Sequence, residues 1–219
     1  MFEFSLGEKL KQASAVLLLG AHSDDIEIGC GGTVLKLVEA YPGLHFYWVV
    51  LGSNGVRTDE AEKSANLFLD GVEHKNIVIK NFKDGFFPYA GVELKQFFEQ
   101  LKKDVRPDLI FTHYRQDLHQ DHRLTCELTW NTFRNHLILE YEIPKYDGDL
   151  GSPNLFVSLN ETFCQRKINI IFDSFLSQAD KHWFTVDTFQ GLMRIRGIES
   201  GSAEKWAEAY YCRKILWSP

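Results

Sequence analysis

Largely apolar runs recur along this chain, and segments of helical pattern separate them. The runs occupy residues 15–20, 46–51, 76–79 and 108–112. A strand that is apolar throughout is typical of a parallel sheet buried on both faces, and parallel strands need crossovers that are usually helices. The sequence therefore predicts an α/β fold, a mostly parallel sheet with helices on both faces.

The remaining elements follow from apolar periodicity and from capping residues. Helices are expected over 31–40, from a cap at Thr58 to about residue 69, over 93–103 and within 118–135. Beyond residue 140 the expected elements are a loop over 141–153, a strand over 155–159, helices over 162–177 and 180–194, a short helix or loop over 203–211, and a closing strand over 212–216. A length of 219 residues fits one domain.

Charge and cysteine usage narrow the class of protein. The formal net charge is −6, so nucleic acid is not an expected partner. The one apolar run near the N-terminus is too short for a membrane span and lacks the flanks of an export signal. Cys30, Cys126, Cys164 and Cys212 form no C-x-x-C pair. Scattered reduced thiols favour a cytoplasmic protein, with a disulfide pair as the alternative.

Two segments rich in His and Asp follow the first and fourth predicted strands, at residues 21–27 and 113–123. Sheets of this type bind ligands beyond the carboxyl ends of their strands, so the two segments are expected to meet in one crevice. His22 and Asp25 lie three apart on a turn, and His122 adds a third ligand. Two histidines and a carboxylate with an open position form a catalytic zinc arrangement. Taken alone, His-x-x-Asp is more often a surface polar pair or a helix cap, and His-x-Asp-His alone is a somewhat better indication of a metal site.

The same segments carry a family resemblance. Residues 21–33, A-H-S-D-D-I-E-I-G-C-G-G-T, resemble the signature A-H-P-D-D-x-E-x-G-C-G-G-T of the PIG-L/LmbE-like N-deacetylases. Residues 119–123, H-Q-D-H-R, are similar to its second signature, H-x-D-H-R, and residues 207–210 are similar to a late A-E-A-F. Ser23 replaces the usual proline, so we expect a slightly less rigid turn and intact metal binding.

The resemblance implies a Rossmann-like fold, with zinc held by His22, Asp25 and His122. It also implies that Asp24 is the general base, which takes a proton from water activated by zinc and can then protonate the leaving amine. His119 matches a second catalytic histidine, expected to stabilise the oxyanion as an imidazolium.

Other polar residues of these segments have expected supporting roles. Asp121 is expected to hydrogen-bond His119 and favour its charged form, and the alternative is a helix N-cap. Arg57, after the second strand, matches an arginine that contacts substrate. Its alternative is a surface arginine beside Asp59 or Glu60.

Three further groups are expected near the site. His113 and Asp117 either support the ligands or are loop polar groups, and Glu27 would orient His22 or cap a helix. The glycines at 29, 31 and 32 would let the backbone approach a ligand.

The sequence thus predicts a zinc-dependent hydrolase that removes the N-acetyl group from an N-acetylhexosamine of the GlcNAc type, releasing acetate and an amino sugar. Iron(II) suits the same ligands as zinc. The expected partner is a small amino-sugar substrate, bound partly by the region after about residue 140, with no membrane span; a homo-oligomer stays open. The alternatives are a zinc hydrolase of a non-sugar amide and a non-catalytic module that binds a sugar or nucleotide.

Overall fold

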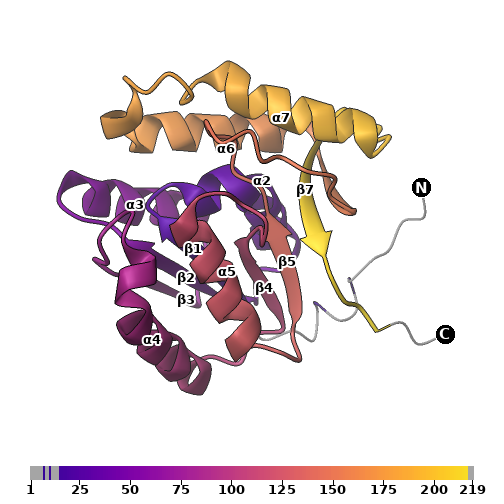
Figure 1. The fold of residues 1–219 in the computed structure, drawn as a ribbon. Helices are drawn as coiled ribbons and strands as arrows, with labels where there is room; N and C mark the ends of the chain where they lie inside the picture. Colours follow the sequence, from indigo (N-terminus) through magenta and orange to yellow (C-terminus); the bar gives the residue numbers. More distant parts are fainter. Residues whose placement is uncertain (1–6, 8–9, 11–14, 217–219) are drawn as a thin grey trace.

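The computed structural model describes Gly7, Leu10 and residues 15–216, which form a seven-stranded sheet flanked by helices (Figure 1). The strands are β1 (Ala15–His22), β2 (His45–Gly52), β3 (Lys75–Ile79), β4 (Leu109–His113), β5 (Leu137–Tyr141), β6 (Leu155–Leu159) and β7 (Trp206–Cys212). The α-helices are α2 (Asp25–Ala40), α3 (Val56–Phe68), α4 (Gly91–Asp104), α5 (Gln120–Thr132), α6 (Glu161–Ser174) and α7 (Val186–Glu199). Two 3₁₀ turns are η1 (Phe87–Ala90) and η2 (Leu176–Gln178).

The strand order is β3-β2-β1-β4-β5-β7-β6. The first five strands of this order pair in parallel, and β7 pairs antiparallel with both β5 and β6. The predicted mostly parallel α/β sheet is therefore confirmed. Because the chain winds outward from β1 to β3 and returns to β4 on the other side, a crevice opens at the carboxyl ends of β1 and β4.

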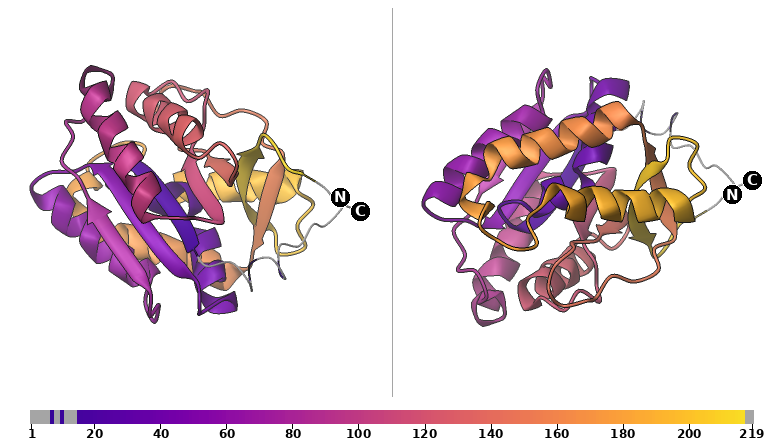
Figure 2. Two further views of the ribbon diagram at one scale, coloured as in Figure 1. Left: turned by 90° about the horizontal axis from the view of Figure 1, so that it is seen from below. Right: turned by 90° about the horizontal axis from the view of Figure 1, so that it is seen from above.

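Each face of the sheet is buried under its own set of helices, and the two sets are separated by the sheet in Figure 2. Helices α2, α3, α6 and α7 cover one face, while η1, α4 and α5 cover the other. In β1, Val16 and Leu18 pack into the first core and Leu17 and Leu19 into the second. This double burial explains why the strand is apolar at successive positions.

Helix α2 begins at Asp25 rather than at residue 31, because its glycines belong to the helix. A Cβ on Gly29 would lie 2.1 Å from Cδ2 of Tyr141, and one on Gly32 would lie 2.5 Å from Cδ1 of Leu159. These glycines let α2 pack closely on β5 and β6. The expectation that they admit a ligand to the backbone is wrong.

The structure corrects several expectations about individual elements. Thr58 is not a helix cap, since α3 begins after Gly55, whose φ of 52° suits glycine. Strand β5 was not predicted. Residues 206–212 form β7, where the sequence predicted a short helix or loop over 203–211 and a strand only from residue 212. Helix α7 begins after Thr185, whose hydroxyl oxygen accepts a hydrogen bond from the backbone N–H of Thr188.

Two expectations from composition can be compared with the described residues. All four cysteines are free thiols, as the scattered spacing predicted, and three of them are buried. Among the residues that the structure describes, no helix has the length and apolar character needed to cross a bilayer.

Candidate active site

The His- and Asp-rich segments meet at the crevice between β1 and β4. His22 ends β1, Asp25 begins α2, and His122 lies in the first turn of α5. All three line a cavity of about 480 Å³. The fold brings together segments that are nearly a hundred residues apart in the sequence, at the place where the reversal of strand order favours a ligand site.

Ligand atoms of three residues approach one another in this cavity, and Asp25 contributes both of its carboxylate oxygens. Nδ1 of His22 lies 3.1 Å from Nε2 of His122 and 3.4 Å from Oδ2 of Asp25. Nε2 of His122 lies 3.5 Å from Oδ1 of Asp25. Tetrahedral ligands at zinc distances of about 2.0–2.1 Å are separated from each other by roughly 3.3–3.4 Å. The closest distances between the three side chains therefore match those between zinc ligands, with each histidine nitrogen near a different oxygen of Asp25.

A carboxylate lies behind each of the two histidines. Nε2 of His22 is 3.2 Å from Oδ2 of Asp121 and 3.1 Å from Oδ1 of Asp84. Nδ1 of His122 is 2.9 Å from Oδ2 of Asp117. A metal-binding histidine typically donates its second N–H to such a carboxylate, which fixes the ring and makes it a stronger ligand. The second nitrogen of each ring thus has the partner that a metal-binding histidine needs.

The carboxylate of Asp121 contacts His22 rather than the ring of His119. It also accepts hydrogen bonds from the backbone N–H groups of Gly85, at 2.7 Å, and Phe87, at 3.1 Å. His119 is itself the N-cap of α5, because its Nδ1 accepts from the backbone N–H of Asp121 at 3.2 Å. Asp121 is therefore neither the N-cap nor a carboxylate partner of His119 in this structure.

The protonation expected for His119 also differs. Partial burial lowers the pKa of His119, which favours the neutral ring over the imidazolium. Since Nδ1 accepts a hydrogen bond, the proton of the neutral ring is on Nε2. His119 can still act as a donor in this form.

Asp24 and Arg57 form a pair on the wall of the cavity. Nη2 of Arg57 lies 2.8 Å from Oδ1 of Asp24, so Arg57 is not a surface residue facing Asp59 or Glu60. Burial raises the pKa of Asp24, and the guanidinium opposes this shift. Oδ2 of Asp24 and Nη1 of Arg57 are buried and have no hydrogen-bond partner among the described residues. The pair therefore offers one acceptor and one donor to a ligand.

Residues 23 and 27 lie close to the ligands in sequence and have different roles. The hydroxyl of Ser23 donates to that of Ser53 at 2.9 Å, and Ser53 lies 3.2 Å from the hydroxyl of Thr58. This link holds the turn where the family has proline.

Glu27 is fully buried, burial raises its pKa, and neither oxygen has a hydrogen-bond partner among the described residues. It does not orient His22.

Asp25 and Asp117 are held partly by His113 and Lys145. The sequence suggested His113 only as a supporting or loop residue and did not suggest Lys145. Nε2 of His113, at the end of β4, lies 3.2 Å from Oδ2 of Asp25. Nζ of Lys145, in the loop after β5, lies 3.0 Å from Oδ2 of Asp117 and 2.5 Å from Asp149. Lys145 had no motif to mark it, because it belongs to a loop without periodicity.

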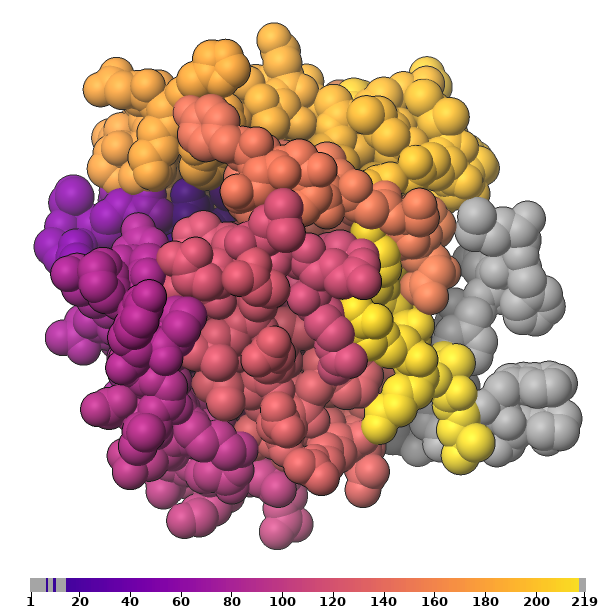
Figure 3. All heavy atoms as spheres, viewed as in Figure 1, coloured from indigo at the N-terminus to yellow at the C-terminus, as the bar shows by residue number. Residues whose placement is uncertain are grey.

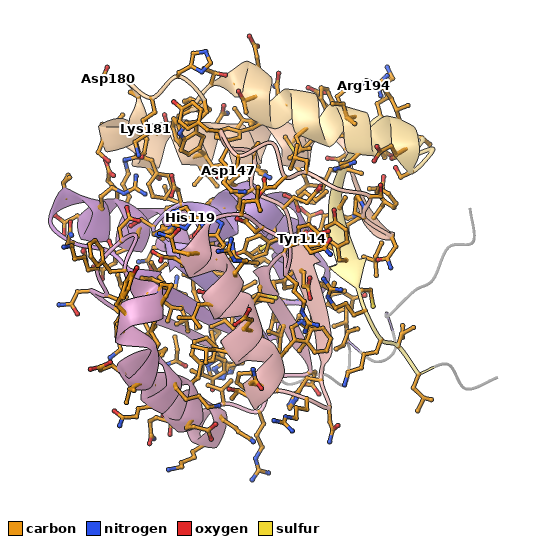
Figure 4. The ribbon with its side chains drawn as sticks, in the orientation of Figure 1. Tyr114, His119, Asp147, Asp180, Lys181 and Arg194 are labelled. Carbon is orange, nitrogen blue, oxygen red and sulfur yellow. The ribbon has the colours of Figure 1, made fainter. Side chains whose placement is uncertain are left out.

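The outer wall of the cavity comes from the C-terminal part of the chain. The loop 142–154 and the segment 175–185 between α6 and α7 lie against each other on the surface (Figure 3). The labelled side chains of Asp147 and Lys181 lie above His119 in Figure 4. The wall residues of these two segments are Ile143, Lys145, Tyr146, Asp147, Gln178, Lys181 and Trp183.

The motifs and the geometry point to one family. The family model described as PIG-L, GlcNAc-PI de-N-acetylase, matches residues 17–133, more than half of the chain. The chain belongs to the PIG-L family. The predicted hydrolase of the deacetylase class is thereby confirmed at the level of the family.

Relatives of this PIG-L protein agree with the assignment. A protein of Escherichia coli (strain K12), described as uncharacterized deacetylase YaiS, is 28% identical over 182 residues, which cover 77% of this chain and 94% of the relative. The N,N'-diacetylchitobiose deacetylase of Pyrococcus horikoshii has a TM-score of 0.70 at 21% identity, covering 94% of this chain and 86% of that one.

A third neighbour shows that the fold alone does not fix the reaction. GalB of Pseudomonas putida KT2440, a 4-carboxy-2-hydroxymuconate hydratase, has a TM-score of 0.73 at 15% identity and covers 94% of this chain and 98% of that one. The reaction must therefore be argued from the site.

Proposed function

We propose that this PIG-L protein hydrolyses the N-acetyl group of an N-acetylhexosamine, with zinc held by His22, Asp25 and His122. One observation carries the proposal. Donor atoms of these residues converge at 3.1–3.5 Å, and the second nitrogen of each histidine faces a carboxylate. Zinc bound there would polarise the amide carbonyl and lower the pKa of water from 15.7 to about 7.

Asp24 is proposed as the general base. Its Oδ2 has no hydrogen-bond partner among the described residues, so it can accept the proton of the attacking water and pass it to the leaving nitrogen. Arg57 holds the other oxygen of this carboxylate at 2.8 Å. The guanidinium favours the ionised form of Asp24, which a base needs at neutral pH.

His119 is proposed to stabilise the oxyanion that develops as the carbonyl is attacked. The neutral ring carries its proton on Nε2, which is free of the N-cap hydrogen bond. A neutral imidazole N–H positioned before the reaction stabilises developing negative charge without needing to reorganise. Asp121 contributes indirectly, by holding His22 at Nε2.

The choice of an amino sugar over another acylated amine is supported by the relatives. The neighbour from Pyrococcus horikoshii is described as a deacetylase of N,N'-diacetylchitobiose, and the matching family model as a de-N-acetylase of a GlcNAc conjugate. Nη1 of Arg57, buried without a hydrogen-bond partner among the described residues, offers a donor to a sugar hydroxyl or to the acetamido oxygen. A non-sugar amide would contact the same metal ligands, Asp24 and Arg57, so the relatives rather than these residues favour an amino sugar.

Acetate release tests this function. The metal-loaded protein is incubated with N-acetylglucosamine glycosides and with an N-acetylated alkylamine, with and without a chelator. We expect acetate from the glycosides only, loss of activity with the chelator, and recovery on adding zinc or iron(II). No acetate from any glycoside, or equal release in the presence of chelator, would overturn the proposal.

A further inference from the structure

Two serines of the crevice follow neighbouring parallel strands at the same level. His22 of β1 pairs in register with Gly52 of β2, so Ser23 and Ser53 are the first residues beyond that pair. Both serines are buried, and both line the cavity. The hydroxyl of Ser23 donates a hydrogen bond to that of Ser53 at 2.9 Å. The strand register therefore brings these two hydroxyls together.

Ser53 is the fixed point of this contact. Its backbone N–H donates to the carbonyl of Lys80, directly after β3, at 2.9 Å. Its hydroxyl lies 3.2 Å from that of Thr58, which belongs to the first turn of α3. Three hydroxyl groups, those of Ser23, Ser53 and Thr58, therefore form a chain from the turn after β1 to the start of α3.

A second connection joins the same two segments. Asp24 follows Ser23, Arg57 precedes Thr58, and Nη2 of Arg57 lies 2.8 Å from Oδ1 of Asp24. The hydroxyl chain, the ion pair and the backbone between them close a ring of five residues: Ser23, Asp24, Arg57, Thr58 and Ser53. The ion pair alone would leave the turn free to pivot about one contact, whereas two connections fix its orientation.

The orientation of Asp24 matters because only one of its oxygens is held. Oδ1 accepts from Arg57, and Oδ2 is buried without a hydrogen-bond partner among the described residues. A general base acts within hydrogen-bond reach of the proton that it removes, and a displacement of about 1 Å can cost about 10²-fold in rate. A turn held at two points keeps Oδ2 in a fixed place relative to the metal ligands His22 and Asp25.

We propose that Ser23, Ser53 and Thr58 are positioning residues, whose hydroxyl chain holds the Asp24–Arg57 pair in the orientation that the reaction needs. The inference rests on the function proposed above and adds three residues that act through Asp24. In this chain the hydroxyls supply a rigidity that a proline at position 23 would give by fixing φ.

The rate of acetate release, with kcat and KM measured separately, tests the positioning role in the metal-loaded protein. Ser23→Ala should lower kcat roughly twofold to tenfold, the fold-change that corresponds to one hydrogen bond, and leave KM and zinc content unchanged. Thr58→Val, which removes the hydroxyl and keeps the shape, should do the same, and Thr58→Ser should keep most of the rate. Ser158→Ala is the control, since its hydroxyl lies 2.6 Å from that of Ser202 and it is not among the residues that line the cavity.

The double variant Ser23→Ala/Thr58→Val distinguishes one chain from two independent effects. Because both changes break the same chain, kcat of the double variant should be close to that of the slower single variant. A double variant that shows the product of the two single losses would overturn the proposal. An unchanged kcat in both single variants, or an equal loss in Ser158→Ala, would overturn it as well.

A crystal structure of metal-loaded Ser23→Ala separates this proposal from the reaction itself. We expect the carboxylate of Asp24 to turn away from Arg57, so that the contact of 2.8 Å is lost or only partly occupied. A fully occupied pair at the original distance would overturn the proposal. A displaced carboxylate, in a protein whose wild type releases no acetate, would instead contradict the proposed function alone.

Discussion

Replacing Lys167 by Met should destabilise the protein far more than replacing any surface lysine. Nζ of Lys167, buried in α6, lies 2.7 Å from Oε1 of Glu208 in β7 and donates to the carbonyl of Ile28 in α2 at 2.7 Å. Glu208 also accepts from the backbone N–H groups of Gly32 and Thr33, at 2.8 and 2.7 Å. The pair joins α6 and β7 to α2, the helix that begins with Asp25.

The size of the effect follows from burial. Lys167→Met leaves Glu208 as an uncompensated charge in the core, a change that costs about 3–5 kcal/mol. A domain is stable by only about 5–15 kcal/mol in total. For a chain of this length, each kcal/mol shifts Tm by roughly 2–4 °C, so a fall of about 6–20 °C is expected.

Denaturation by urea and by heat, each followed by circular dichroism, measures this loss. Lys95→Met is the control, because Lys95 forms an exposed ion pair with Glu99 and should cost less than about 1 kcal/mol. The double variant Lys167→Met/Glu208→Gln should be more stable than Lys167→Met, because it removes the unpaired charge. A single variant within about 1 kcal/mol of wild type, or a double variant that is no better, would refute the reasoning.

Three further predictions concern the site and the thiols. Asp24→Asn should lower kcat by about 10²–10⁴ and leave the metal content unchanged, measured by acetate release and elemental analysis. Lys145→Met should weaken zinc binding roughly 10- to 100-fold in a chelator competition, because Asp117, which holds the ring of His122, loses its neighbouring cation. Lys145→Arg keeps a cation at this position and should therefore retain part of the zinc affinity. Burial raises the pKa of Cys164 to about 11, so iodoacetamide at pH 8 should modify the less buried Cys212 and spare Cys164 until the protein unfolds.

The sequence predicts the meeting of the two His- and Asp-rich segments because local and topological rules act together there. His22 follows an apolar strand, His122 follows another, and a parallel sheet places both carboxyl ends at one edge. The partner of Asp121 could not be predicted in the same way. It depends on α5 being capped at His119, which turns the Asp121 carboxylate toward His22 and the start of η1.

Several of the remaining errors arise where contacts join residues that lie far apart in the chain. Glu208 interrupts the apolar pattern of β7. A buried glutamate is tolerated there because its partners, Lys167 and the backbone N–H groups of Gly32 and Thr33, come from distant parts of the chain. The sequence places the start of α2 at residue 31 rather than 25 because glycine is a poor helix former. In the structure the small size of Gly29 and Gly32 serves contacts with β5 and β6, far along the chain. Lys145 and Trp183 sit in loops, where no periodicity marks a residue that faces the cavity.

The metal content of purified variants tests the central claim most directly. Elemental analysis of the protein loaded with zinc and then dialysed should find about one ion per chain in wild type and far less in His122→Ala, because that change removes one of three converging donors. His182→Ala, at a histidine outside the three, should keep the full amount. A full ion in folded His122→Ala, confirmed by circular dichroism, would contradict the account.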